Sequence, residues 1–255
     1  MSTPSLRTER LTIRFGGHVA VHGVTCAFRP GELTAIVGPN GAGKTTWFNL
    51  VSGQLTPTEG RIFLGERDIT GLSPSARALA GVGRAFQLTN LFPRLTVLEN
   101  VRLAVQARRR AGGRLLSRAA ADRDTIAEAM RYVERTRLAA VAGLPAAALP
   151  HGDQRKLEVA LLLAMEPQVF MFDEPTAGMS VDEAPAILEL IAEIREDRSK
   201  TILLVEHKMD VVRALADRIV VLHNGELVAD GRPGAVMALP IVREIYLGVG
   251  AEKAA

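Results

Sequence analysis

Residues 33–46 read LTAIVGPNGAGKTT, an apolar run followed at once by a glycine-rich loop. The loop fits the pattern G-x-x-x-x-G-K-[ST] through Gly38, Gly43, Lys44 and Thr45. These positions would match by chance in roughly one chain in a hundred of this length. The apolar run predicts a buried strand, and the following KTTWFNLVSG predicts a helix. Strand, loop and helix in this order predict a phosphate-binding loop.

The residue types in this loop suit a nucleoside triphosphate. Gly38, Gly41 and Gly43 leave room for backbone N–H groups to converge on phosphates, which a Cβ would obstruct. Lys44 supplies a charge between the β and γ phosphates, and the Thr45 hydroxyl can ligate Mg²⁺. The simpler interpretation is a glycine-rich turn with a surface lysine, which the strand and helix on either side argue against.

Two adjacent carboxylates end a second apolar run, VFMFDEP, at residues 169–175. Successive residues leaving a strand point in different directions, so Asp173 suits the Mg²⁺ shell and Glu174 suits the water that attacks the γ phosphate. His207 follows a third run, TILLV, where a parallel sheet opens its ligand crevice. A structural role for this histidine is the alternative, and Gln87 in GRAFQ carries no signal by itself.

Further apolar runs extend the predicted sheet. RIFL (61–64) and RIVVL (218–222) read as strands, and the segment 184–195 reads as a helix with Ile187, Leu188, Ile191 and Ile194 on one face. This helix lies between two strands, a βαβ pattern that predicts an α/β fold with a parallel sheet. The pair Asn224-Gly225 predicts a two-residue hairpin.

The composition changes between residues 88 and 150, where alanine and arginine dominate and strand signals vanish. We interpret this segment as a helical insertion into the core. From residue 102 to residue 118 it contains six arginines, and no acidic residue occurs there until Asp122. The positive charge is therefore concentrated on one or two helices. A solvated helix face is the simpler interpretation, and contact with anionic lipid headgroups is the alternative. These residues are Arg102, Arg108, Arg109, Arg110, Arg114 and Arg118.

The whole-chain totals exclude several protein classes. The chain has 255 residues, 47% of them hydrophobic, and a formal net charge of +3, which does not indicate nucleic-acid binding. The single cysteine, Cys26, excludes an internal disulfide and favours a reducing compartment. We expect no membrane span, because no apolar stretch approaches the roughly 18 residues that a span requires.

A loop reading LPHGDQ (149–154) runs directly into RKLEVALLLAM, which has the apolar spacing of a buried helix. The first N–H groups of a helix are free and its dipole favours negative charge, so this helix start can bind an anion. Pro150 is the unusual residue of the loop, because it contributes neither a hydroxyl nor an N–H.

Taken in order, GPNGAGKTT, Gln87, LPHGDQ, FDEP and His207 resemble the nucleotide-binding subunit of ABC transporters over nearly the whole chain. RFGG, GRAFQLTNLFPRLTVLENV, GDQRKLEVA and the late IYLG look most like the ATPase of branched-chain amino-acid importers. The resemblance implies a P-loop NTPase (RecA-like) α/β core with an antiparallel β subdomain and an inserted α-helical subdomain. It implies one ABC ATPase domain over residues 1–255, divided into a core with the N-terminal β subdomain (1–87 and 159–239), a helical subdomain that includes the signature loop (88–158) and a C-terminal tail (240–255).

The resemblance also assigns roles to individual residues. It implies that Phe15 stacks on adenine and that Gln87 senses Mg²⁺ and the γ phosphate. Asp173 would be the Walker B ligand of Mg²⁺ together with Thr45 and Gln87, Glu174 the catalytic base, and His207 the switch histidine. The implied ATP-binding Walker A loop consists of Gly38, Pro39, Asn40, Gly41, Ala42, Gly43, Lys44, Thr45 and Thr46.

LPHGDQ would be the signature loop, which completes the ATP site of the other subunit. It departs from the usual Leu-Ser-Gly-Gly-Gln, since Pro150 stands at the serine, His151 at the first glycine and Asp153 at the glutamine, and only Gly152 is retained. Ser180 replaces the usual D-loop aspartate. We therefore expect an asymmetric dimer in which the site completed by this signature loop is the weaker one.

The implied function is that of an ATP-hydrolysing motor for uptake of branched-chain or related amino acids, with ATP and Mg²⁺ as cofactors. The implied partners are a second ABC ATPase, two membrane permease subunits and a solute-binding protein, without nucleic acid, at the cytoplasmic face of the inner membrane. Gln87 favours the first of two different ATPase chains, because the second usually carries glutamate there; a homodimer is the alternative. Leu88, Leu91, Phe92 and Pro93 would transmit motion to the permeases, or simply belong to the core of the helical lobe.

Four other functions remain open at this stage. Two are transporters of the same family: an amide or urea importer, and a lipopolysaccharide-type exporter. The third is a soluble ABC ATPase acting in DNA repair or on ribosomes, which usually has a long coiled coil or two tandem cassettes that this chain lacks. The fourth is a regulatory subunit that binds ATP without hydrolysing it, against which the complete Walker A loop, Glu174 and His207 argue.

Overall fold

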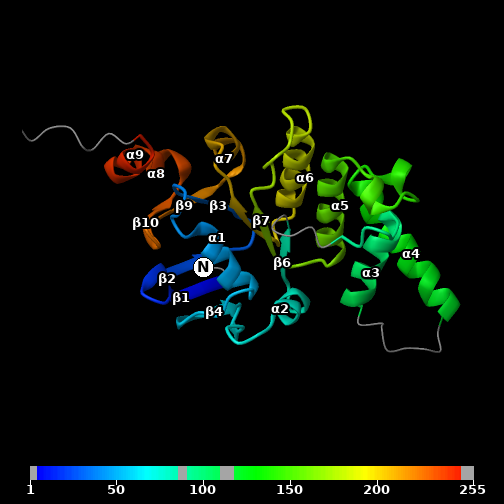
Figure 1. Cartoon of the computed structure of the whole chain (residues 1–255), viewed down its shortest axis with the longest axis horizontal. Coiled ribbons are helices and arrows are strands. Elements are labelled where there is room, and N and C mark those ends of the chain that lie inside the picture. Colours follow the sequence, from blue (N-terminus) through cyan, green and yellow to red (C-terminus); the bar gives the residue numbers. More distant parts are fainter. Residues whose placement is uncertain (1–4, 86–90, 110–117, 248–255) are drawn as a thin grey trace, which may run out of the picture.

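The larger of two sheets forms the centre of the molecule (Figure 1). The structure, a computed structural model, describes residues 5–85, 91–109 and 118–247. Within this part the larger sheet has the order β10-β9-β3-β8-β7-β6, and every neighbouring pair is parallel except β9 and β10. Its strands are β3 (Leu33–Val37), β6 (Val82–Ala85), β7 (Val169–Asp173), β8 (Thr201–Val205), β9 (Arg218–His223) and β10 (Glu226–Gly231).

The smaller sheet is antiparallel and has the order β2-β1-β4-β5. Of these strands, only β4 was predicted from an apolar run. The apolar pattern did not predict β1 and β2, because exposed polar residues lie between their buried residues. Its strands are β1 (Leu6–Phe15), β2 (His18–Phe28), β4 (Glu59–Leu64) and β5 (Arg67–Asp68).

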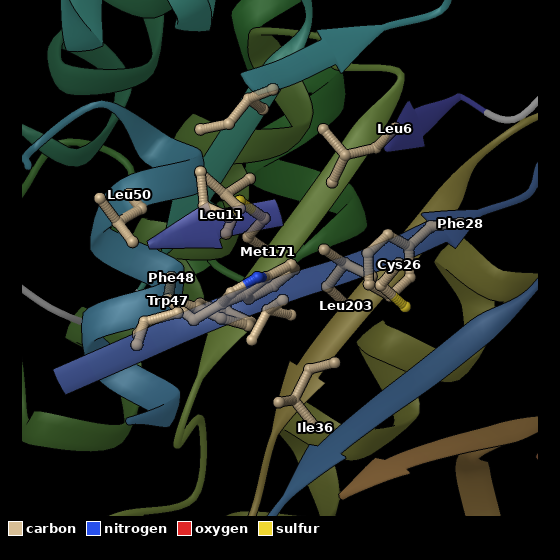
Figure 2. Close-up of a cluster of buried hydrophobic side chains, with 14 of the residues drawn as sticks. Leu6, Leu11, Cys26, Phe28, Ile36, Trp47, Phe48, Leu50, Met171 and Leu203 are labelled. Atoms are coloured by element: carbon tan, nitrogen blue, oxygen red, sulfur yellow. The ribbon is translucent and has the colours of Figure 1, made fainter. Parts of the chain in front are cut away.

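Helix α1 (Lys44–Ser52) begins at the glycine-rich loop and packs into one hydrophobic cluster with side chains from both sheets. Figure 2 shows this cluster around Trp47, with Met171 and Leu203 of the larger sheet and Leu11 of the smaller one. The helix ends at Gly53, whose φ of 85° suits glycine at a helix C-terminus. Helix α1 is therefore held in place through Trp47 and Phe48, two of the largest buried side chains of the core.

The opposite face of the larger sheet is covered by α5 (His151–Ala164) and α6 (Ala184–Glu196), which share a second hydrophobic cluster with β7 and β8. In α6 the buried positions are Ile187, Leu190, Ile191 and Ile194; Leu188, placed on that face by the sequence, is only partly buried. The remaining helices of the described part are α2 (Pro74–Ala80), α3 (Val97–Arg108), α4 (Arg118–Arg135), α7 (Met209–Leu215), α8 (Pro233–Ala238) and α9 (Pro240–Leu247), with 3-10 turns at Ala139–Val141 and Ala146–Ala148.

Helices α3, α4 and α5 form a lobe beside the sheet, with its own hydrophobic cluster (Figure 1). Leu157 and Ala160 of α5 belong to this cluster, whereas Val159 and Leu162 of the same helix belong to the cluster under the larger sheet. Residue 158, the predicted end of the helical insertion, therefore lies inside a continuous helix that packs on both sides. The predicted C-terminal tail contains α9, whose Val242 is fully buried.

Three of the six arginines singled out in the sequence are paired with acidic side chains. Arg102 lies 2.8 Å from a carboxylate oxygen of Glu99, and Arg108 and Arg109 both pair with the buried Glu128. The charge on these residues is therefore offset within the protein, which favours the solvated helix face over a lipid-binding surface. Arg110, Arg114 and the side chain of Arg118 lie outside the described residues.

The strands predicted from apolar runs and the helix at 184–195 are all present, and so is the hairpin between β9 and β10. Asn224 and Gly225 have φ of 49° and 81°, and His223 pairs with Glu226 across them, as a type I′ turn requires. Within the described residues, no helix combines the length and apolar character needed to span a bilayer.

Candidate functional site

The predicted site residues follow three neighbouring parallel strands at the edge where all three end. Asp173, the last residue of β7, pairs with Val205, the last residue of β8, and Ile36 near the end of β3 pairs with Val205 from the other side. The glycine-rich loop, the carboxylates and the histidine-bearing segment therefore leave the sheet side by side, at the edge where open parallel sheets bind ligands.

A pocket of about 300 Å³ lies at this edge. It is lined by residues of the glycine-rich loop, two residues of β2, the first residue after β7 and the second residue after β8. Its lining residues are His18, Ala20, Asn40, Gly41, Ala42, Gly43, Lys44, Thr45, Thr46, Glu174 and His207. The structure thus brings together the predicted loop, base and histidine around one space.

Two glycines in the loop are required by close approaches of the backbone. Gly38 has a φ of 154°, and a Cβ built on it would lie 2.1 Å from the Leu222 carbonyl oxygen. Gly43 has a φ of 95°, and its Cβ would lie 2.6 Å from the Ala20 carbonyl oxygen. Because these neighbours are backbone atoms that cannot move aside, any side chain at either position would distort the loop.

Lys44 is held by the loop itself. Its Nζ donates hydrogen bonds to the carbonyl oxygens of Gly38 (2.8 Å) and Pro39 (2.9 Å). Burial lowers the pKa of this ammonium group, and the negative charges of Glu174 and Asp173 act in the opposite direction. The loop and these two carboxylates therefore keep a cation at the pocket wall, as recognition of a phosphate requires.

Glu174 and His207 contact each other directly across the pocket wall. His207 Nε2 and Glu174 Oε1 are 2.7 Å apart, and both side chains are about 40% exposed. Glu174 has a φ of 50°, a strained value for a residue other than glycine, and its N–H donates to the Val205 carbonyl oxygen at 2.9 Å. The turn at the end of β7 therefore aims the carboxylate at the histidine and into the pocket.

Glu206 is a site residue that our sequence reasoning missed. Its buried carboxylate accepts hydrogen bonds from the backbone N–H groups of His207 (2.7 Å) and Lys208 (3.1 Å) and from the Thr176 hydroxyl (2.5 Å). It thereby ties the histidine segment to the loop that follows Glu174. An acidic residue directly after an apolar strand, in TILLVEH, was the available signal.

Asp173 lies behind the pocket rather than on its lining. Its side chain is 6% exposed and accepts a hydrogen bond of 2.5 Å from Arg84, a residue that sequence reasoning also missed. The described residues contain no group of three or more acidic, histidine or cysteine side chains that could hold a metal. The donor set fits Mg²⁺ nevertheless, because this ion is usually bound through one or two carboxylates together with substrate phosphates, and the Thr45 hydroxyl supplies another hard oxygen.

The loop LPHGDQ leads into α5, for which Pro150 is the N-cap residue without a side-chain cap. Asp153 Oδ1 is bound by Lys156 at 2.8 Å, and His151 is exposed. Glu183 lies over Gly152, so that a Cβ on this glycine would meet the Glu183 carboxylate at 2.7 Å. Hydrogen bonds from Ser180, and a further one from the Gly152 N–H, lower the pKa of Glu183. A carboxylate from the same chain thus lies against the helix start.

Two predicted residues are less well placed by the structure. Phe15 ends β1, is 49% exposed and pairs with His18, which lines the pocket; its contact with adenine remains a prediction. Gln87 lies outside the described residues, as does Leu88.

The chain matches the protein family described as ABC transporter over residues 21–177. Among curated proteins, the chain is 40% identical to the high-affinity branched-chain amino acid transport ATP-binding protein LivG of Salmonella typhimurium, over 97% of this chain and 99% of LivG. It is 39% identical to BraF of Pseudomonas aeruginosa, a protein with the same description, again over 97% of this chain and 99% of the relative.

Solved structures show the same architecture. A nucleotide-free ATP-binding cassette from an ABC transporter superposes with a TM-score of 0.80 at 28% identity, covering 95% of this chain and 98% of the cassette. The ADP conformation of MJ1267, an ATP-binding cassette of an ABC transporter, gives a TM-score of 0.81 at 28% identity, covering 97% of this chain and all of the other. MJ0796, a bacterial ABC transporter cassette, matches with a TM-score of 0.76 at 25% identity, over 89% of this chain and 98% of that cassette, and its structure is dimeric.

Proposed function

The chain belongs to the ABC transporter family, and from that premise we propose that it is the ATP-hydrolysing subunit of an importer for branched-chain amino acids. The observation that carries the proposal is the pocket in which the glycine-rich loop faces the Glu174–His207 pair. The cargo follows from the relatives, since LivG and BraF are both described as branched-chain amino acid transport ATP-binding proteins.

The site residues divide the chemistry of ATP hydrolysis among them. Lys44 and the N–H groups of the loop bind the phosphates, and Glu174 accepts the proton of the attacking water. Bound Mg²⁺ would neutralise charge on the phosphates, with Asp173 and Thr45 as its ligands from this chain. His207 contacts Glu174 and orients it until the γ phosphate arrives.

ATP can drive transport only if it binds one conformation of the transporter better than another. A nucleotide placed between two ATPase subunits, with the signature loop of each completing the pocket of the other, has this property because it favours the closed dimer. The dimeric cassette MJ0796 supports such an assembly, and we favour two different ATPase chains over a homodimer. Glu183 must then leave Gly152 before this helix start can accept a phosphate.

We place the protein at the cytoplasmic face of the membrane, attached through two permease subunits that receive amino acids from a solute-binding protein. Phe92 at the surface of the helical lobe is 55% exposed, and Leu144 nearby in the same lobe is 46% exposed. Pro93, the next residue, is also exposed, whereas Leu91 packs against the hydrophobic cluster of the lobe. This apolar surface is the proposed permease contact.

Uptake measurements test this proposal. Deletion of the gene is expected to abolish ATP-dependent uptake of radiolabelled leucine, and the wild-type gene, but not a Lys44→Ala variant, is expected to restore it. If leucine uptake persists while urea or acetamide uptake falls, the amide or urea importer is correct. If no uptake changes and the outer-membrane lipopolysaccharide content falls, the exporter is correct.

The signature loop gives a second prediction. Pro150→Ser restores a hydroxyl at the start of α5, which can both cap the helix and donate to the γ phosphate in the partner's site. A hydrogen bond to a charged group contributes about 1.5–3 kcal/mol. We therefore expect the ATP affinity of that site in the assembled heterodimer to rise about ten-fold or more, measured by nucleotide titration and ATPase rate.

Pro74→Ser is the matched control, because Pro74 is an exposed proline at the first turn of α2, outside the signature loop. It should change neither the affinity nor the rate. If Pro150→Ser also leaves both unchanged, the expected asymmetry of the dimer is wrong.

A further inference from the structure

Arg84 is a buried arginine on β6 whose guanidinium contacts the Walker B carboxylate. Its Nη2 donates to Asp173 Oδ2 at 2.5 Å, and the two side chains are 7% and 6% exposed. β6 lies beside β7 in the sheet, and Arg84 precedes Gln87 by three residues. A buried carboxylate is unfavourable unless it is paired and hydrogen-bonded, so Asp173 depends on this cation.

The same guanidinium is also hydrogen-bonded to helix α1. Its Nη1 donates to Asn49 Oδ1 (2.7 Å) and Ser52 Oγ (2.9 Å), and its Cζ lies 5.4 Å from the centre of the Phe48 ring. These three residues belong to α1, the helix that begins at the phosphate-binding loop. Nη1 also donates to Gln54 Oε1 at 3.4 Å, just beyond the end of that helix. One planar group therefore connects this helix to the carboxylate, and it does so with donors on both of its terminal nitrogens.

Lys44 does not compete for this role, because its ammonium group is bound by the carbonyl oxygens of Gly38 and Pro39. The one hydrogen bond described for the Asp173 side chain ends on Oδ2. Arg84 therefore fixes the rotation of the carboxylate through one oxygen and leaves Oδ1 as the oxygen available to a metal ion.

We propose that Arg84 is a positioning residue for Mg²⁺: by binding Oδ2 and α1 at once, it sets Asp173 in register with the phosphate-binding loop, so that metal and nucleotide bind as one unit. This inference rests on the proposed ATPase function. Metal ligands are commonly oriented by hydrogen bonds from residues behind them, and their loss weakens metal binding. Arg84 is not part of the pocket lining, so its loss should weaken the metal contribution rather than nucleotide binding itself.

Arg84→Lys tests the proposal because it retains the positive charge and removes the fork that spans Asn49 and Asp173. The affinity for a fluorescent ATP analogue is measured in EDTA and at increasing Mg²⁺. In EDTA we expect the affinity of the variant to stay within about two-fold of the wild-type value. The Mg²⁺ concentration that gives half of the Mg²⁺-dependent increase in affinity should rise about ten-fold, which corresponds to one lost hydrogen bond to a charged group. Circular dichroism checks that the variant is folded.

Two further variants complete the design. Asn49→Ala removes one anchor of Arg84 without leaving a buried charge unpaired, so it should fold even if Arg84→Lys does not. We expect the required Mg²⁺ concentration to rise about three-fold, as for the loss of one neutral partner. Arg195→Lys is the matched control, since Arg195 pairs with Asp217 and neither residue lines the pocket. Asp217 accepts from the Leu33 N–H at the start of β3, whereas the phosphate-binding loop follows its end, so this variant should leave the Mg²⁺ dependence unchanged.

The outcomes separate this inference from the proposed function. An unchanged Mg²⁺ dependence in both Arg84→Lys and Asn49→Ala, with wild-type protein that binds MgATP, would overturn the positioning role alone. Wild-type protein that binds no ATP at any Mg²⁺ concentration would overturn the proposed function and this inference with it.

Discussion

Replacing Glu174 by glutamine is expected to lower ATP turnover by about 100- to 10,000-fold, the usual contribution of a general base, and to leave ATP binding intact. Glutamine keeps the size of the side chain and a partner for His207 at the 2.7 Å contact, but it cannot accept the proton of the attacking water. The backbone turn at this position, with its φ of 50° and its N–H bonded to Val205, does not depend on the carboxylate. Steady-state phosphate release gives the turnover, and nucleotide titration gives the affinity.

The chain provides a matched control for this substitution. His22 Nδ1 and Glu226 Oε1 form a similar exposed pair 2.8 Å apart, and neither residue lines the pocket. Glu226→Gln should therefore leave turnover within about two-fold of wild type, as expected for a surface pair that contributes little. Turnover near the wild-type rate in Glu174→Gln would remove the base from this position. Wild-type protein that binds ATP without measurable turnover would instead favour the regulatory, non-hydrolysing subunit.

The part of the site that was predictable lies where local sequence determines local geometry. LTAIV followed by GPNGAGKTT specifies a strand, a turn and a helix within one short segment, and the pocket contains the predicted loop residues from Asn40 to Thr46. Strand ends on a parallel sheet converge by topology, which is why Glu174 and His207 could be placed at one edge before their contact was known.

Other features depend on pairings between distant residues, which no single segment encodes. Arg84 and Asp173 are separated by 89 positions, and Thr176 and Glu206 by 30. In the sequence, Arg84 is one arginine among many and Glu206 one acid after a strand. Burial makes these contacts important, because a charged group is stable in the interior only when it is paired and hydrogen-bonded.

The antiparallel sheet shows the same limit in the fold. β1 and β2 are long strands, but exposed residues interrupt their apolar positions and register shifts break the alternation along β1. A period of two is lost when a strand contains such irregularities. The resemblance to a family implied this sheet, whereas the apolar pattern alone gave only β4.

Trp47→Ala is expected to destabilise the protein by about 3–5 kcal/mol, the usual cost of removing a large aromatic side chain from a core. Trp47 is 1% exposed, and its ring lies 5.5 Å from that of Phe28 and 5.8 Å from that of Phe48, centre to centre. Figure 2 shows it in the middle of the cluster that holds α1. Because Trp47 is the only tryptophan, urea unfolding must be followed by circular dichroism rather than by intrinsic fluorescence.

Trp47→Phe separates packing from hydrogen bonding at the same position. The Trp47 Nε1–H is buried and finds no hydrogen-bond partner among the described residues, and an unpaired buried donor costs about 1–3 kcal/mol. Phenylalanine removes this donor while retaining most of the apolar contact, so the loss of stability should be less than half of that in Trp47→Ala. Phe92→Ala, on the exposed surface of the helical lobe, should stay within about 0.5 kcal/mol of wild type. If Trp47→Phe were as destabilising as Trp47→Ala, the indole nitrogen would have to be satisfied in solution, and α1 would be held by a polar contact as well as by the packing that we describe.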